Sequence, residues 1–128
     1  MRTRLTIRLD FDESRRLGPG KVALLESIGE TGSISAAGRA HEMSYRKAWL
    51  LVEEMNRMFA APLVSARPGG VNGGGAALTA AGAQVVALYR EAERKMRLGA
   101  RAEIAGIERA LAAIEEAGAA RPATARAP

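Results

Sequence analysis

Residues 33–59, SISAAGRAHEMSYRKAWLLVEEMNRMF, carry apolar side chains at the spacing of two short helices that share one buried face. The apolar positions recur at steps of about three to five residues, near the helical period. Ser33 and Ser44 each precede a helical run, where a serine hydroxyl can accept a hydrogen bond from an unpaired backbone N–H. The sequence therefore predicts two helices, beginning after Ser33 and after Ser44. The predicted buried stripe consists of Ala36, Ala37, Ala40, Met43, Ala48, Val52, Met55 and Phe59.

The two predicted helices must also lie close together. Ala36, Ala37 and Gly38 are small, and small side chains let two steeply crossing helices bring their backbones into contact. A pair of this kind can lay its second helix in the major groove of DNA. We therefore expect a gene regulator.

The composition favours a mainly helical domain. The chain has 128 residues, of which 48% are hydrophobic but only 4% aromatic, so its core must consist of aliphatic side chains and alanine. This length indicates one domain. The absence of cysteine excludes disulfides, thiolate metal sites and a cysteine nucleophile.

Three further elements are predicted around the helix pair. Residues 3–11 alternate polar and apolar side chains, with Leu5, Ile7, Leu9 and Phe11 on one side, as in a half-buried strand. Apolar residues from Val22 to Ile28 predict a helix that the glycines at 29 and 32 end. Short strands at 63–64 and 76–78 flank the glycine-rich loop 67–75, as in a wing.

From residue 79 to 117 an apolar seam recurs every three or four residues. An unbroken helix of this length would extend ~58 Å at 1.5 Å per residue, more than a small domain needs for its own core, so the seam predicts pairing with another chain. Gly82, Gly99 and Gly106 weaken such a helix, and a break near Gly99 is the alternative. Residues 118–128 are expected to be disordered. The predicted dimerisation residues are Tyr89, Met96, Ile104, Ile107, Leu111 and Ile114.

These elements predict a fold that is mainly α with a small β wing: a winged helix-turn-helix followed by a long C-terminal dimerisation helix. The predicted domains are 1–78 for DNA binding, 79–117 for dimerisation and 118–128 as a tail. Nineteen Lys and Arg against fourteen Asp and Glu give a net charge of +5, which is moderate for a nucleic-acid binder.

The helix from 44 to 59 opens with the polar and basic residues that a groove-reading helix presents to base edges. Arg46 or Lys47 could reach guanine O6 and N7, and Tyr45 a phosphate or a thymine methyl group. Trp49 is expected either to pack or to lie at the boundary between helix pair and wing, with its indole N–H free for a phosphate. The candidate DNA-binding residues are Ser33, Ser35, Ser44, Tyr45, Arg46, Lys47, Trp49, Arg67, Asn72, Gly73 and Gly74.

Several other kinds of site are disfavoured. The glycine-rich loop lacks the GxxxxGK[ST] motif of a nucleotide site. His41 is the only histidine, and without cysteines or clustered carboxylates it makes neither a metal site nor a catalytic triad. We expect no enzyme activity and no cofactor. No segment has the ~20 apolar residues that span a bilayer, and no signal peptide is evident, so a cytoplasmic protein is expected.

Four motifs together carry a family resemblance. ISAAGRAHEMSYRKAW, the EMN at 54–56, the GGxxGGGAxLT pattern at 69–79 and the LYR at 88–90 resemble the N-terminal winged-helix domain of ModE-type molybdate-responsive regulators. The resemblance covers about residues 5–98, and the helix pair is more distantly similar to that of LysR-type regulators. It implies sequence-specific DNA binding by a homodimer, joined through its long helix, on a two-fold symmetric operator.

The resemblance stops near residue 98, so we expect the molybdate-binding domains of two-part ModE proteins to be missing and molybdate not to be sensed. A different class of function stays open: a helical interaction or adaptor module whose long helix pairs with another protein. The sequence leaves open the operator, the effector signal and the sign of regulation.

Overall fold

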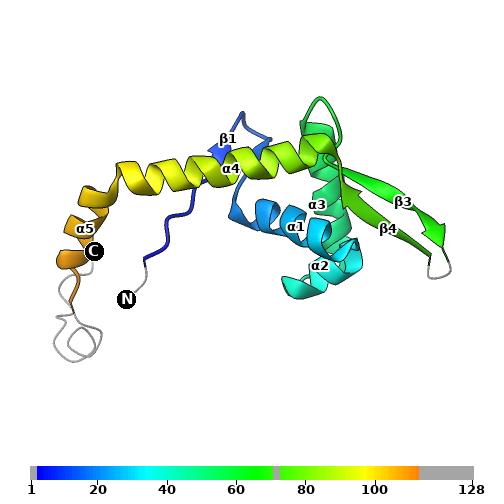
Figure 1. Cartoon of the computed structure of the whole chain (residues 1–128), viewed down its shortest axis with the longest axis horizontal. Helices are drawn as coiled ribbons and strands as arrows, with labels where there is room; N and C mark the ends of the chain where they lie inside the picture. The colour runs from blue at the N-terminus through cyan, green and yellow to red at the C-terminus, as the bar shows by residue number, and fades with distance from the viewer. Residues whose placement is uncertain (1–2, 71–72, 113–128) are drawn as a thin grey trace. The chain divides into compact units, whose positions relative to one another are not determined.

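The computed structural model describes residues 3–70 and 73–112 of the chain (Figure 1). Its contacts divide the chain into two compact units, Met1–Lys95 and Met96–Pro128. The described part is mainly helical with two small antiparallel sheets, as the sequence predicted. The elements in chain order are β1 (Leu9–Asp10), β2 (Arg16–Leu17), α1 (Pro19–Thr31), α2 (Ile34–Ala40), α3 (Tyr45–Met58), β3 (Val64–Gly70), β4 (Gly73–Leu78), α4 (Ala80–Gly99) and α5 (Arg101–Arg109).

Helix α1 supplies the centre of the core of the first unit. Its side chains Val22, Leu24, Leu25 and Ile28 are fully buried. The helix ends where Gly32 takes a left-handed conformation (φ +71°) and donates its N–H to the Ile28 carbonyl at 2.8 Å, a common helix ending. The predicted first helix is confirmed, with Gly29 inside it rather than at its end.

Both predicted starts of the helix pair are confirmed. The Ser33 hydroxyl accepts a hydrogen bond from the Ala36 N–H at 3.0 Å, and the Ser44 hydroxyl accepts one from the Lys47 N–H at 3.1 Å. Close approach of α2 and α3 is also confirmed, because a β-carbon on Gly38 would stand 3.0 Å from the Ala48 β-carbon.

The turn between the two helices folds back on α2. The Met43 N–H donates to the Gly38 carbonyl at 2.9 Å, and Glu42 adopts a positive φ of 57°. Most of the predicted stripe is buried or partly buried. Ala40 is exposed instead, since it is the last residue of α2 and the chain turns away directly after it.

The predicted strand over residues 3–11 is mostly wrong. Only Leu9 and Asp10 pair with a partner, β2, in the register Leu9 to Leu17 and Asp10 to Arg16. The alternation persists at Leu5 and Ile7, which are half-buried, but Leu9 and Phe11 are exposed. The partner strand has two residues, so no longer ladder can form.

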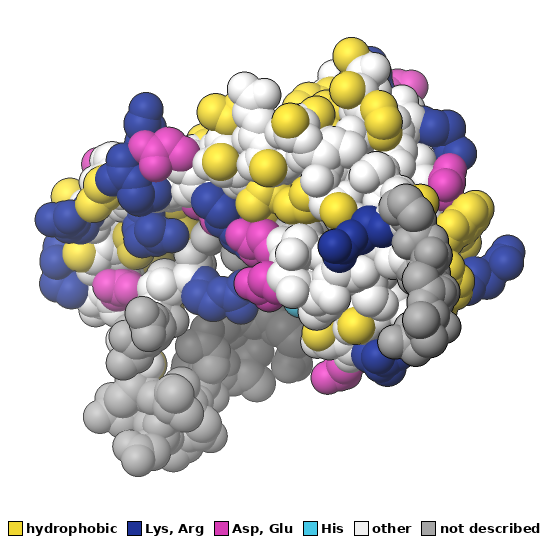
Figure 2. All heavy atoms as spheres, turned by 45° about the vertical axis from the view of Figure 1, so that its right-hand side comes forward, with side chains coloured by type: hydrophobic (Ala, Val, Ile, Leu, Met, Phe, Trp, Pro, Cys, Tyr) yellow, Lys and Arg dark blue, Asp and Glu magenta, His cyan; other side chains and the backbone are white. Residues whose placement is uncertain are grey.

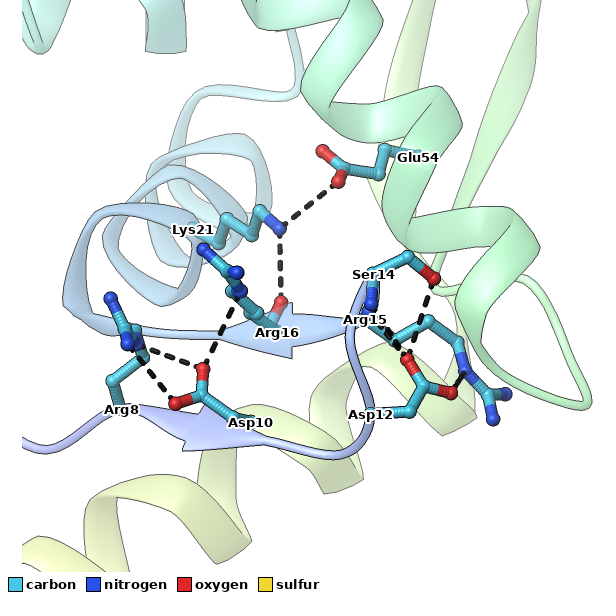
Figure 3. A network of polar contacts seen from close by, with 8 residues as sticks. All are labelled: Arg8, Asp10, Asp12, Ser14, Arg15, Arg16, Lys21 and Glu54. Atoms are coloured by element: carbon cyan, nitrogen blue, oxygen red, sulfur yellow. Dashed lines mark hydrogen bonds and ion pairs between the residues drawn. The ribbon is translucent and has the colours of Figure 1, made fainter.

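Polar contacts tie this small hairpin to α1 and α3 (Figure 3). The Lys21 ammonium on α1 donates to the Arg16 carbonyl at 2.9 Å and forms an ion pair with Glu54 on α3 at 3.4 Å. In the hairpin turn, hydrogen bonds from the side chain and backbone of Arg15 and from the backbone of Ser14 lower the pKa of Asp12 to about 2. The hairpin therefore braces the two helices from one side.

Helix α4 begins on top of the loop that follows α3. The Thr79 N–H donates to the Leu63 carbonyl at 2.9 Å, and the Thr79 hydroxyl donates to the Pro62 carbonyl at 2.7 Å. The same hydroxyl accepts the Gly82 N–H at 3.0 Å. A β-carbon on Gly82 would stand 2.1 Å from the Leu63 carbonyl oxygen, so glycine is required there.

Tyr89 and Arg90, in the LYR motif, attach α4 to the first unit. Tyr89 is buried, and its hydroxyl donates to the Ile7 carbonyl. The Arg90 guanidinium makes two hydrogen bonds to the Glu26 carboxylate on α1 and one to Glu93, a buried carboxylate on α4 itself. Burial is the main cause that raises the pKa of the Tyr89 hydroxyl above its usual value.

The helix predicted for residues 79–117 is broken at the glycine that the sequence singled out. Helix α4 ends at Gly99 and α5 begins at Arg101, with Ala100 between them at φ −105° and ψ 15°. Helix α5 ends at Arg109, short of the predicted end. The weak helix propensity of glycine explains the position of the break. Ile114 and the predicted tail 118–128 lie outside the described residues.

Candidate nucleic-acid interface

Helix α3 presents an outward face opposite its buried stripe. Ala48, Val52 and Met55 are buried against the core. Because a helix turns about 100° per residue, the side chains farthest from that stripe are those of Arg46, Leu50, Glu53 and Arg57. Tyr45 and Trp49 flank this face and are 57% and 41% exposed. The first turns of α3 thus expose a mixture of aromatic, basic and apolar groups.

The cations on the first turn of α3 are unpaired in the part of the chain that the structure describes. Neither the Arg46 nor the Lys47 side chain has an ion pair or a hydrogen bond there. Arg57, two turns later, lies 3.8 Å from the Glu53 carboxylate. The free positive charge of α3 is therefore concentrated at its N-terminal end, where the helix dipole also favours anions.

Lys and Arg side chains are spread over the face shown in Figure 2, with apolar side chains between them. They do not form one continuous basic patch on that face. Any polyanion bound to this molecule would therefore meet a small number of defined cations rather than a broad field.

A hollow of about 140 Å³ joins the helix pair to the second sheet. It brings together three of the predicted residues, Ser33, Ser35 and Tyr45, with Gly75 and Ala76 of β4. The Ser35 hydroxyl accepts a hydrogen bond from the Arg39 guanidinium at 2.8 Å. The starts of α2 and α3 and the base of the sheet thus form one continuous surface.

Strands β3 and β4 form a hairpin that extends away from the helices (Figure 1). The predicted strand pair is confirmed, and the strands run farther into the glycine-rich segment than expected, to Gly70 on one side and from Gly73 on the other. Arg67 is exposed on β3, opposite Gly75. Gly73 and Gly74 lie in β4, whereas Asn72 lies outside the described residues.

The base of the hairpin is attached to the end of α1. The Ala76 N–H donates to the Gly32 carbonyl at 2.9 Å, and a β-carbon on Gly75 would stand 2.6 Å from that oxygen. Sequence reasoning treated Gly75 only as part of a pliable loop and missed this contact. No local signal could have revealed it, because Gly32 is distant in sequence.

Asn56 links the other end of the hairpin to α3, a role that the sequence did not reveal. Its side-chain oxygen accepts the N–H groups of Leu63 and Val64 at 2.8 and 3.1 Å, and its amide donates to the Val64 carbonyl at 3.0 Å. This clamp sets the position of β3 relative to α3. The hairpin and the reading helix are therefore held as one piece.

Other kinds of site find little support in the described residues. Over 3–70 and 73–112, no three His, Cys, Asp or Glu side chains are grouped as metal ligands would be. His41 is exposed and lies 2.8 Å from the Ser27 hydroxyl. No helix in the same ranges combines the length and the apolar character that a bilayer span requires.

The chain is similar to proteins of molybdenum metabolism. No family model matches it. It is 55% identical over 74 residues to the molybdenum-pterin-binding protein MopB of Rhodobacter capsulatus, covering 58% of this chain and 27% of MopB. It is 40% identical over 85 residues to the molybdenum transport protein ModE of Azotobacter vinelandii, covering 66% and 32%. It is 34% identical over 89 residues to the DNA-binding transcriptional dual regulator ModE of Escherichia coli K12, covering 70% and 34%.

These matches cover more than half of this chain but only part of each relative. The chain spans about a third of the length of the curated relatives that it matches. The resemblance carried by the sequence motifs is thus confirmed, and the chain is related to the ModE-type regulators over the third of their length that it spans.

Proposed function

We propose that this chain is a sequence-specific DNA-binding transcription regulator with a winged helix-turn-helix, in which α3 reads the major groove and the β3–β4 hairpin is the wing. The observation that carries the proposal is the start of α3. Ser44 caps the helix, and Arg46 and Lys47 stand on its first turn without ion-pair partners in the described part of the chain. The related ModE of Escherichia coli is named a DNA-binding regulator.

Each part of the interface has a proposed role. Arg46 and Lys47 would bond base edges, and the Ser33, Ser35 and Tyr45 hydroxyls in the shared hollow would hold the sugar-phosphate backbone. Trp49 would lie beside the backbone at the edge of the groove. Arg67 and the glycine strand from Gly73 to Gly75 would follow the neighbouring groove. Such a protein would act in the cytoplasm.

We further propose that the regulator is a homodimer on a two-fold symmetric operator, as the family resemblance implies. In the second unit, Met96, Ile107 and Leu111 are 47%, 66% and 56% exposed, and Ile104 is half-buried. Large apolar side chains exposed at this density suit a subunit contact. Tyr89 was expected in the same seam but is buried against Ile7 of its own chain, so the dimer proposal does not use it.

Titration of labelled promoter DNA at several salt concentrations tests the proposal. The logarithm of the affinity should fall linearly with the logarithm of the salt concentration, because binding releases counterions from phosphates. Arg46→Ala should weaken the preferred site by roughly 1–3 kcal/mol and relax its sequence preference. Arg57→Ala is the matched control, since Arg57 lies two turns away and is 3.8 Å from Glu53. Salt-independent binding without sequence preference would refute the proposal.

Light scattering tests the dimer. The full chain should have twice the mass of one chain, and Ile107→Glu with Leu111→Glu should lower it to one. A chain that gains a defined mass only with a different protein would favour the adaptor function instead. Because we expect no molybdate sensing by this chain, molybdate should leave the DNA titration unchanged.

A further inference from the structure

Leu50 is an apolar side chain on the outward face of α3. It is 47% exposed and follows Arg46 by one helical turn, on the side opposite the buried stripe. A single exposed leucine needs no explanation. This one lies between two cations that have no ion-pair partner in the described part of the chain, on the helix that we propose to enter DNA.

These groups share one surface feature. Ser44, Arg46, Lys47, Leu50 and the half-buried Leu51 line an open hollow of about 280 Å³. Phosphate alone would satisfy the cations but would leave Leu50 in water. An apolar protein surface would cover Leu50 but would desolvate two charges without pairing them. The occupant must therefore offer hydrogen-bond acceptors and an apolar group within a few ångströms of each other.

The major groove of DNA has this combination. Guanine presents O6 and N7 as acceptors, and thymine presents its 5-methyl group. We propose that Leu50 packs on a thymine 5-methyl group while Arg46 or Lys47 bonds an acceptor of an adjacent base pair, which makes Leu50 a specificity-determining residue. The inference rests on the proposed function, and it adds a base class that the charged residues cannot select.

The test uses the full chain and DNA with single atoms changed. A preferred site is first selected from a random duplex library, and each thymine in it is then replaced by deoxyuridine, which lacks only the methyl group. Wild-type affinity should fall about fourfold at one thymine in each half-site, the value of one buried methyl group. At that position Leu50→Ala should bind thymine and uracil equally, whereas Leu50→Met should retain the preference.

The outcomes separate the two proposals. Sequence-selective binding that no uracil substitution weakens would overturn the role of Leu50 and leave the proposed function standing. A thymine preference that persists unchanged in Leu50→Ala would also overturn it, because the methyl group would then contact another residue. Failure to select any site would end both proposals. The uracil series uses the wild-type chain, so it is decisive even if a variant folds poorly.

Discussion

Arg90 on α4 holds Glu26 on α1 with two parallel hydrogen bonds, Nε to Oε2 at 2.8 Å and Nη2 to Oε1 at 2.7 Å. A third bond joins its Nη1 to the Glu93 carboxylate at 2.7 Å. Glu93 is 6% exposed, and Arg90 is the cation that compensates its charge. The arginine therefore fastens α4 to the helical core through one partner and permits burial of a charge through the other.

Replacing Arg90 should therefore cost more than replacing Glu26. Arg90→Met should lower the free energy of unfolding by roughly 1–3 kcal/mol, less than for a fully buried pair because the arginine is partly exposed. Glu26→Gln should cost about 1 kcal/mol or less, since it leaves the Arg90–Glu93 pair intact. Urea unfolding followed by circular dichroism measures both. Equal losses would mean that Glu93 does not depend on Arg90.

The same contact predicts a loss of stability in acid. The Arg90 side chain lowers the pKa of the Glu26 carboxyl below its ordinary value of 4.5, mainly through the hydrogen bonds. Its contribution to stability is complete above that value and declines as the pH falls toward the lower pKa of the folded state. The free energy of unfolding should therefore drop below about pH 4.5. Glu26→Gln should drop less steeply, and parallel curves would show that this contact does not titrate.

Gly82 gives a prediction that contradicts helix propensity. Alanine is the better helix former by up to ~1 kcal/mol, but at this position its β-carbon would overlap the Leu63 carbonyl oxygen. Gly82→Ala should lower the free energy of unfolding by about 2 kcal/mol or more, as overpacking does. Gly99→Ala is the matched control, because nothing lies within 4 Å of its β-carbon position, and it should be neutral or stabilising. Thermal unfolding of both variants decides the matter.

The helix pair could be predicted from the sequence because its determinants are local. Ser33 and Ser44 act within three residues of themselves, and the buried stripe follows helical spacing. The contact of Gly82 with Leu63 joins residues far apart in the chain, so the sequence showed only a weak point in a helix.

The candidate interface was predictable to a similar degree. Periodicity marked Tyr89 as buried but could not distinguish burial in its own chain from burial in a partner. Leu50 could have been found, since it follows Arg46 by four residues, on the face that faces away from Val52. The contact of Gly75 with Gly32 could not, because it depends on the folded hairpin.

Asn56 should be essential for the position of the wing. Asn56→Ala removes three hydrogen bonds to Leu63 and Val64 and leaves their backbone groups partly buried and unpaired. We expect a loss of about 2–3 kcal/mol in the free energy of unfolding. Arg57→Ala next to it should change the stability by less than about 0.5 kcal/mol, because its ion pair is exposed. If Asn56→Ala proved as mild as Arg57→Ala, the clamp would not hold the hairpin.

Glu42 occupies the turn of the helix pair in a conformation that suits glycine. Its φ of 57° lies in the left-handed region, which costs a residue with a β-carbon about 1–2 kcal/mol. Glycine avoids that strain but loses about 0.5–1 kcal/mol through the greater entropy of its unfolded chain. Glu42→Gly should therefore stabilise the protein by up to about 1 kcal/mol, and Glu42→Val, with a β-branched side chain, should destabilise it by a similar amount or more. Urea titrations of the three proteins rank them, and a valine variant as stable as the glycine variant would show that the turn relaxes to another conformation.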